Sequence, residues 1–227
     1  MTENSIAVHG FNKMANFFLV LENQSATLID TGGKDKIENI RAKFEKTGYD
    51  LSRLQRIIIT HSHFDHTGSL AELKRATEAL VLAHEAEVPY LTQQARLPRP
   101  AGPVGFMFGL LQPFFRTPGA EVDVILHDGD LLEGTGLKVI HTPGHTPGHI
   151  CLYHPAAKAL FTGDSIVNRK GRLQGPVHFF SSDIFEARRS VGRLAELEIE
   201  TIYFAHGEIM RGVPKNLLRS LSLSLAK

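Results

Sequence analysis

The sequence lacks tryptophan and contains a single cysteine, Cys151, among 227 residues. One cysteine excludes an internal disulfide and favours a reducing compartment. The first residues show no basic start followed by an apolar run, so we expect no secretory signal peptide. No stretch approaches the roughly 20 consecutive apolar residues that span a bilayer. We therefore expect a cytoplasmic protein without a membrane span.

An excess of charge of one sign is also missing. The chain has 25 Lys and Arg residues against 24 Asp and Glu residues, a formal net charge of +1. This balance argues against a nucleic-acid partner. A hydrophobic content of 42% and a charged content of 22% are typical of a globular protein. The length suits a single domain over residues 1–227, and a homodimer is left open.

Short apolar strands alternate with helical patterns and glycine turns, which predicts an α/β (α+β) class. Strands are expected at 16–22, 26–30, 56–60, 81–83, 124–126, 137–140, 150–153, 159–162 and 201–204. Helices are expected at 34–46, 69–80, 183–194 and 214–225. The third of these helices is expected to take its N-terminal cap from Ser181 or Ser182.

The segment 96–119 has an unusual composition, because it combines five prolines with four phenylalanines. The prolines argue against a regular element, and the apolar content argues against an exposed linker. We expect an irregular apolar insertion that forms a lid, the wall of an apolar substrate pocket, or a dimer contact. The candidate pocket residues are Phe106, Phe108, Phe114 and Phe115.

Twelve histidines are present, and three of them lie within residues 61–66, which read His-Ser-His-Phe-Asp-His. In an extended segment residues i and i+2 project to the same side, so His61 and His63 can share one cation. Asp65 and His66 follow where the chain turns toward the next helix, and they can face a second cation. Neutral imidazole and carboxylate are ligands that zinc prefers in a cysteine-free site.

Further ligands are expected where other strands end. The loop 141–149 lies between two expected strands and is rich in histidine, glycine and proline. Asp164 stands at the end of an expected strand, in the sequence Phe-Thr-Gly-Asp, and His206 stands at the end of another, in Phe-Ala-His-Gly. A carboxylate and imidazoles at strand ends are suited to complete a metal site.

The motifs 61–66, Thr142–His145, Gly163-Asp164 and His206-Gly207, in this order, resemble the metal motifs of the metallo-β-lactamase-fold hydrolases. The turn Asp30-Thr31-Gly32 resembles the early turn of that family. The resemblance implies a four-layer αββα sandwich with two mixed β-sheets and the metals at one edge. It implies two zinc ions, with iron or manganese as alternative metals.

The resemblance also implies a role for each matching residue. The ligands implied for one metal are His61, His63 and His145. The ligands implied for the second metal are Asp65, His66 and His206, with Asp164 bridging both. Asp30 is implied to orient ligands through hydrogen bonds. His149 flanks the match and is expected to support the site without binding metal.

The activity implied is that of a dinuclear zinc hydrolase, in which a metal-bridging hydroxide attacks a small thioester, ester or lactone. Asp65 and Asp164 are the candidates for proton transfer. Basic groups after the Asp164 turn, Arg172 and His178, could bind a substrate carboxylate or phosphate. The expected partner is therefore a small-molecule substrate.

Two hydrolase subfamilies and one non-hydrolase are the alternatives. Glyoxalase II enzymes share the motif spelling, but their helical C-terminal extension binds glutathione and only 20 residues follow Gly207 here. N-acyl homoserine lactone lactonases have a tyrosine three residues after the bridging aspartate, where this chain has Val167. A mononuclear iron persulfide dioxygenase uses the same scaffold and is the non-hydrolase alternative.

Overall fold

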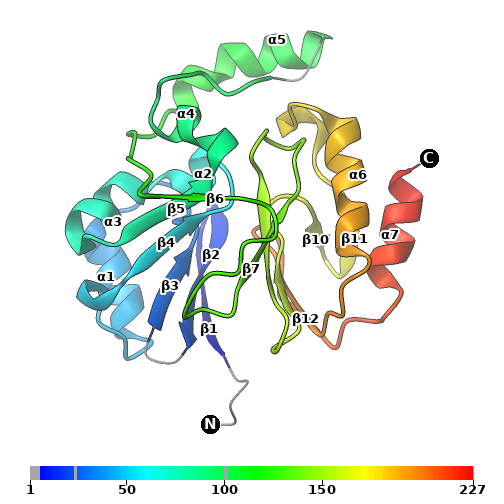
Figure 1. The fold of residues 1–227 in the computed structure, drawn as a ribbon. Helices are drawn as coiled ribbons and strands as arrows, with labels where there is room; N and C mark the ends of the chain where they lie inside the picture. The colour runs from blue at the N-terminus through cyan, green and yellow to red at the C-terminus, as the bar shows by residue number, and fades with distance from the viewer. Residues whose placement is uncertain (1–5, 23–24, 100–101, 227) are drawn as a thin grey trace. The chain divides into compact units, whose positions relative to one another are not determined.

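The structure is a computed structural model that describes residues 6–22, 25–99 and 102–226 (Figure 1). The chain divides into two compact units. Unit 1 comprises Met1–Arg96 and Phe115–Leu126, and unit 2 comprises Leu97–Phe114 and His127–Lys227. The prediction of one domain over 1–227 stays a prediction. Within the described ranges, no helix is both long and apolar enough to cross a bilayer.

Unit 1 is built on a six-stranded sheet in the order β1-β2-β3-β4-β5-β6. Its strands are β1 (Ala7–Lys13), β2 (Ala15–Glu22), β3 (Ser25–Ile29), β4 (Arg56–Ile59), β5 (Leu80–His84) and β6 (Val124–Leu126). The first three strands pair antiparallel, and β3 to β6 pair parallel, so the sheet is mixed. The helical segments are α1 (Ile37–Glu45), η1 (Leu51–Arg53), α2 (Phe64–Thr67), α3 (Leu70–Thr77), η2 (Glu85–Glu87) and α4 (Val88–Leu91). A further short segment, η3 (Gln112–Phe115), belongs to unit 2 except for its last residue, where unit 1 resumes.

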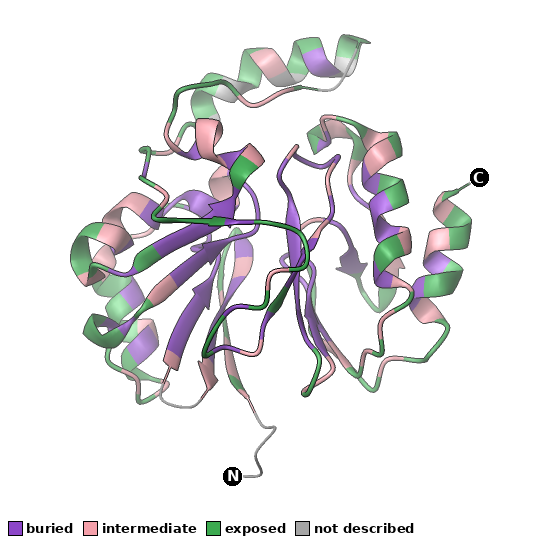
Figure 2. Cartoon of the chain, viewed as in Figure 1, coloured by how far each residue is buried: buried purple, intermediate pink, exposed green. Residues whose placement is uncertain are grey.

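The core of unit 1 lies between its sheet and the helices α1 and α3 (Figure 1). Alternate strand residues face these helices, among them Leu28 of β3 and Ile57 of β4, because successive side chains of a strand point to opposite faces. Phe44 of α1 and Leu73 of α3 pack against them and are fully buried. Figure 2 shows the central strands of this sheet as mainly buried. This packing holds the carboxyl ends of β3, β4 and β5 in adjacent positions.

Unit 2 is built on a five-stranded sheet in the order β13-β12-β9-β8-β7. Its strands are β7 (Lys138–His141), β8 (Ile150–His154), β9 (Ala159–Phe161), β12 (Thr201–Tyr203) and β13 (Met210–Arg211). Only β12 and β9 pair parallel among the pairs described for this sheet. A separate hairpin joins β10 (Val167–Arg169) and β11 (Arg172–Gln174). The helical segments are α5 (Gly102–Leu111), η4 (His178–Phe180), α6 (Ile184–Leu194) and α7 (Leu217–Leu225).

The core of unit 2 lies between its sheet and the helices α6 and α7. Cys151 of β8 and Ile202 of β12 are fully buried and belong to one cluster with Leu194 of α6. Leu221 of α7 joins the same cluster. α6 and α7 also lie side by side (Figure 1). The loops that follow β7, β9 and β12 therefore start from a rigid, well-packed layer.

The mixed α/β class with two mixed sheets is confirmed, and every strand expected from the sequence is present. The strands β1 and β13 and the β10–β11 hairpin are additional to those expected. The expected cap of α6 is wrong: the carboxylate of Asp183 accepts the Glu186 N–H, so neither serine caps the helix. The last helix begins at Leu217, three residues after Pro214.

The irregular backbone expected for 96–119 is wrong for Gly102–Leu111, which forms α5. The prolines do not prevent this helix. Pro103 lies in its first turn, where a missing N–H costs nothing, and Pro113 lies beyond its end. Phe106 and Leu110 are 67% and 57% exposed, so these side chains do not pack into the core.

Candidate metal centre

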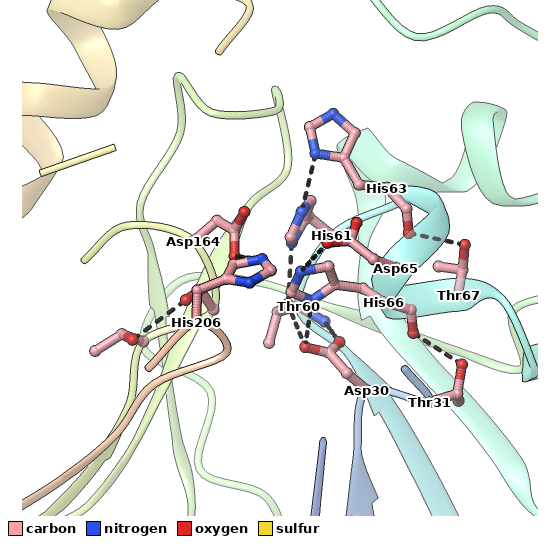
Figure 3. A network of polar contacts seen from close by, with 12 residues as sticks. Asp30, Thr31, Thr60, His61, His63, Asp65, His66, Thr67, Asp164 and His206 are labelled. Atoms are coloured by element: carbon pink, nitrogen blue, oxygen red, sulfur yellow. Dashed lines mark hydrogen bonds and ion pairs between the residues drawn. The ribbon is translucent and has the colours of Figure 1, made fainter. Parts of the chain in front are cut away.

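Asp30 follows β3 directly, and its carboxylate lies at the centre of a polar network in unit 1 (Figure 3). Its Oδ1 accepts the Thr60 N–H, and its Oδ2 accepts the Thr60 hydroxyl, both at 2.8 Å. The same Oδ2 lies 2.8 Å from Nδ1 of His66. Asp30 therefore ties the end of β4 to His66. Because its Nδ1 faces a carboxylate, the His66 ring has its Nε2 side directed toward Asp65, with Asp65 Oδ2 at 3.9 Å.

The hydrogen bonds of Thr60 determine the tautomer of His61. Thr60 has one hydroxyl proton and donates it to Asp30, so its oxygen can only accept from His61 Nδ1, which lies 3.1 Å away. The proton of a neutral His61 ring is therefore on Nδ1, and Nε2 carries the lone pair. That Nε2 lies 3.1 Å from Nδ1 of His63. The two nitrogens need either a proton or a cation between them.

The backbone of residues 61–66 changes from extended to helical at His63, which flanks the first residue of α2 with φ −69° and ψ 150°. His61 and His63 thus lie on the extended part, while Asp65 and His66 lie in the single turn of α2. This is the change of direction that the spacing of the motif predicts. The three histidines are buried, and the side chain of Asp65 is 16% exposed.

The turn after Asp30 holds the far end of α2. The N–H and the hydroxyl of Thr31 both donate to the carbonyl of His66 at 2.8 Å. The N–H of Gly68 donates to the carbonyl of Gly32, and a Cβ at Gly68 would lie 2.2 Å from the backbone nitrogen of Lys34. The backbone approach is therefore too close for any side chain at this position.

In unit 2, each carboxylate oxygen of Asp164 faces a histidine, and Figure 3 shows one of the two, His206. Its Oδ2 lies 3.3 Å from Nε2 of His145, and its Oδ1 lies 3.4 Å from Nε2 of His206. Asp164 follows β9, His145 lies in the loop between β7 and β8, and His206 follows β12. Three strand ends of one sheet thus direct one carboxylate and two imidazoles at each other.

The tautomer of His145 follows from Ser181, whose hydroxyl donates to the carbonyl of Val177 at 2.8 Å. With its proton used, the Ser181 oxygen can only accept from His145 Nδ1, 3.3 Å away. In the neutral ring Nε2 then carries a lone pair that points at a carboxylate oxygen of Asp164. Two electron-rich atoms at 3.3 Å repel each other unless a proton or a cation lies between them.

His149 is fully buried and contacts the main chain of Asp164. Its Nε2 accepts the Asp164 N–H at 3.0 Å, so Nδ1 carries the ring proton and faces Thr142 Oγ1 at 2.8 Å. Ser165 Oγ lies 3.3 Å from the same Nδ1. Both ring nitrogens of His149 thus contact polar groups of the chain.

Two glycines let the ligand loops approach neighbouring elements. Gly144 has φ +115°, and a Cβ there would lie 2.1 Å from the Ala187 nitrogen in the first turn of α6. Gly207 has φ +119°, and a Cβ there would lie 2.1 Å from the Asn168 carbonyl oxygen. The histidines beside these two glycines are thereby held by main-chain packing, which only glycine permits.

Each unit therefore contains side chains whose donor atoms suit a divalent metal. The described residues that carry ligand-type atoms in such groups are His61, His63, Asp65, His66, His145, Asp164 and His206. Imidazole nitrogens and carboxylate oxygens without thiolates fit zinc, and they also fit iron or manganese. A cation would relieve the short contacts that the Nε2 atoms of two of these histidines make with other electron-rich atoms.

The predicted substrate-binding residues belong to unit 2, except for Phe115, where unit 1 resumes. Arg172 on β11 and His178 at the start of η4 are both exposed. Phe106 of α5 and Phe114 are 67% and 82% exposed. The side chains of Phe108 and Phe115 lie outside the described residues. α5 contacts η4 within unit 2, and η4 is followed directly by the serine that contacts His145.

Three residues that hold the ligands are not apparent from the sequence. Thr60 and Ser181 orient His61 and His145, and Glu87 binds the segment between His61 and His63. A hydroxyl residue beside a ligand motif is a weak signal in sequence, because most such residues serve caps and turns. Glu87 lies 25 positions from its partner, and no local pattern marks it.

Residues 11–206 match the family model described as the metallo-beta-lactamase superfamily. The chain is 31% identical over 233 residues to the probable metallo-hydrolase YflN of Bacillus subtilis (strain 168), covering 92% of this chain and 87% of that protein. It is 36% identical over 159 residues to the hydroxyacylglutathione hydrolase of Pseudomonas syringae pv. syringae (strain B728a). That match covers 68% of this chain but only 48% of the hydroxyacylglutathione hydrolase.

Solved structures of similar fold include the metallo-beta-lactamase family protein TTHA1429 from Thermus thermophilus. Its TM-score is 0.73 at 20% identity, over 96% of this chain and 78% of that chain. A second is TTHA1623 in a di-iron-bound form, with a TM-score of 0.67 at 27% identity, over 91% of this chain and 94% of that chain. Both agree with the fold expected from the sequence.

Proposed function

Because the chain belongs to the metallo-β-lactamase superfamily, we propose that it is a dizinc hydrolase that cleaves a small thioester, ester or lactone. The family membership makes it a metallo-hydrolase by relationship. The number and identity of the metals and the bond that is cleaved are the proposal. One zinc ion would be held by His61, His63 and His145, the other by Asp65, His66 and His206, and Asp164 would bridge them.

The observation that carries this proposal is the position of Asp164 between two histidines. The two carboxylate oxygens of Asp164 face different imidazole nitrogens, Oδ2 the Nε2 of His145 and Oδ1 the Nε2 of His206. That geometry suits a ligand shared by two ions. The contact of His61 with His63 and that of Asp65 with His66 suit the same division into two groups.

When bound, zinc ions at this site would activate a water molecule and polarise the scissile carbonyl. Other residues of the chain would hold the metal-binding side chains in position. Asp30 holds His66 and, through Thr60, His61, while Ser181 holds His145. Asp65 is the carboxylate we propose to accept a proton during the reaction, because its side chain is partly accessible whereas Asp30 is committed to three hydrogen-bond contacts.

We propose that α5 and η4 bind the apolar part of the substrate. The exposed side chains of Phe106, Leu110 and Phe180 are apolar surface on two elements that contact each other. Ser181 follows η4 directly and contacts His145, one of the proposed metal ligands. The apolar surface therefore lies next in sequence to a residue that orients a metal ligand of unit 2. Arg172 and His178 would bind a polar or anionic end of the substrate.

A glutathione thioester is one member of this substrate class, because a hydroxyacylglutathione hydrolase is among the relatives. The chain spans about half the length of that relative, so a substrate without the glutathione moiety is equally in keeping with the match. Iron is the alternative metal, because TTHA1623 has been solved in a di-iron-bound form.

Metal analysis and a substrate panel test the proposal. The full chain, purified without added metal and then loaded with zinc, is expected to hold two ions and to hydrolyse at least one of a glutathione thioester, an acyl homoserine lactone, a simple lactone or an aryl ester. One iron per chain with oxygen consumption on a persulfide would contradict it and identify the dioxygenase. A β-lactam and a phosphodiester complete the panel.

The substrate surface has its own test. Phe106→Ala is expected to raise KM for substrates with long acyl chains by about threefold to tenfold, as loss of one apolar contact does. KM for a short acetyl ester should not change, which makes this substrate the matched control. A loss of self-association in sedimentation, with KM unchanged for both substrates, would instead show that α5 is a dimer contact.

A further inference from the structure

A buried carboxylate outside the seven proposed ligands contacts the histidine motif from its other side. Glu87 is the last residue of η2 and is fully buried. Its Oε2 accepts the N–H of Ser62 at 2.9 Å, and it also accepts the Ser62 hydroxyl at close range. Ser62 lies between His61 and His63, the two residues of the motif that share an extended backbone.

We infer that Glu87 is a positioning residue for the metal site, and this inference rests on the proposed function. The two hydrogen bonds described above both go to Ser62, and so they fix the residue that joins His61 to His63. The spacing and the relative orientation of the two imidazoles are therefore held from outside the motif.

The sheet explains how this carboxylate reaches the motif. β4 lies between β3 and β5, and the motif follows β4. Asp30 follows β3 and binds Thr60 and His66, while Glu87 comes three residues after β5 and binds Ser62. The segment is thus held by one carboxylate from each neighbouring strand.

A purely structural role does not account for the chemistry of Glu87. Burying a carboxyl group is costly, and an apolar side chain of similar size would fill the same space without that cost. An apolar side chain, however, could not accept hydrogen bonds from the N–H and the hydroxyl of Ser62, which both donate to Oε2 of Glu87. Partners that orient metal ligands typically contribute about tenfold to hundredfold in metal affinity.

The test is a zinc competition with a chromogenic chelator on the zinc-loaded full chain, with thermal unfolding measured on the same samples. Glu87→Ala is expected to lose about tenfold or more in zinc affinity. Glu87→Gln, which keeps an acceptor oxygen without the charge, should stay within about threefold of the wild type. The matched control is Glu85→Ala, an exposed glutamate of the same turn, which should bind zinc with unchanged affinity.

Each result decides the inference. Unchanged zinc affinity in Glu87→Ala overturns it, and so does an equal loss in Glu87→Gln, because the charge and not the position of the acceptor would then matter. Should Glu87→Ala fail to fold, Ser62→Ala decides: a loss of about threefold supports the inference and an unchanged affinity overturns it. A wild-type chain that binds no zinc, iron or manganese overturns the proposed function, and the inference with it.

Discussion

His149 holds the main chain of Asp164, since its Nε2 accepts the Asp164 N–H at 3.0 Å. This bond places the residue that faces both His145 and His206. It also determines the tautomer of His149, whose Nδ1–H is left to donate to Thr142 Oγ1 at 2.8 Å. A histidine outside the proposed ligand set thus decides where a central carboxylate lies.

Replacing His149 by asparagine tests this relationship. An asparagine can reproduce the donor at Nδ1 but has no atom at the position of Nε2, so the Asp164 N–H loses its acceptor. We expect kcat on the best substrate of the panel to fall by about tenfold to hundredfold. The matched control is His154→Asn, at the other end of β8, where the Nδ1 position that accepts the Ala157 N–H is retained. Equal kcat values in the two variants would contradict the role of His149.

Asp164→Asn replaces one of the two oxygens that face histidines by an amide nitrogen. We expect the bound zinc to fall from two ions to one or fewer per chain, and kcat to fall by at least about hundredfold, because an amide is a poor bridging ligand. Inductively coupled plasma mass spectrometry and steady-state kinetics measure the two quantities. Glu133→Gln removes one exposed charge and serves as the control. Two retained zinc ions would refute the bridging assignment.

Asp35 is expected to make stability depend on acid pH. Although desolvation opposes ionisation, hydrogen bonds from Asn39, Lys43 and the Lys36 N–H hold the pKa of the Asp35 carboxyl at about 2, below its usual 3.8. Since the folded-state pKa is the lower one, the ionised carboxylate stabilises the fold above about pH 4, and this contribution disappears as the pH falls to about 2. Asp35→Asn should therefore lower the free energy of unfolding by about 1 kcal/mol at pH 7 and by progressively less below about pH 4.

Urea unfolding at a series of pH values between 7 and the acid limit of folding measures this difference. Glu133→Gln should show the same stability as the wild type at every pH. A difference between Asp35→Asn and the wild type that grows on acidification would contradict the assigned direction.

Cys151 is expected to be unreactive in the folded protein. Burial raises the pKa of its thiol to about 11, even though Thr142 and Ser165 oppose the shift through hydrogen bonds. At neutral pH the group is therefore a protonated thiol inside the core of unit 2. Ellman's reagent should label almost none of the native protein near neutral pH and one thiol per chain in guanidinium. Rapid labelling without denaturant would show that β8 opens readily.

Gly144→Ala is expected to destabilise the ligand loop. A Cβ at this position would lie 2.1 Å from the Ala187 nitrogen, and φ is +115°. We expect a loss of about 3 kcal/mol or more in the free energy of unfolding, since both strain and steric overlap arise. Gly171→Ala is the matched control: φ is +82° there but no atom lies within 4 Å, so only about 1 kcal/mol should be lost. Equal losses in urea unfolding would show that the close contact at α6 is not rigid.

The sequence alone predicts much of the fold because its periodicities are strong. The apolar runs within 16–22 and 56–60 are strands in the structure, and Ile40 and Phe44 do face the core from one helix. Short edge elements such as β13, with two residues, carry too little pattern to be recognised. The sequence does not predict the helix α5, because prolines normally exclude a regular element. Here the prolines lie at or beyond the two ends of the helix.

The residues proposed as ligands are also visible in the sequence, since His61, His63, Asp65 and His66 are close together and Asp164 and His206 end strands. Supporting roles for Asp30 and His149 are expected from the motif match, but nothing in the sequence marks Thr60, Ser181 or Glu87 as residues that hold the ligands. Ser181 and Glu87 contact residues 36 and 25 positions away, and Thr60, although it is next to His61, donates its hydroxyl proton to Asp30, 30 positions away. Which nitrogen of His61, His145 or His149 carries the proton depends on those bonds, so the tertiary structure alone decides it.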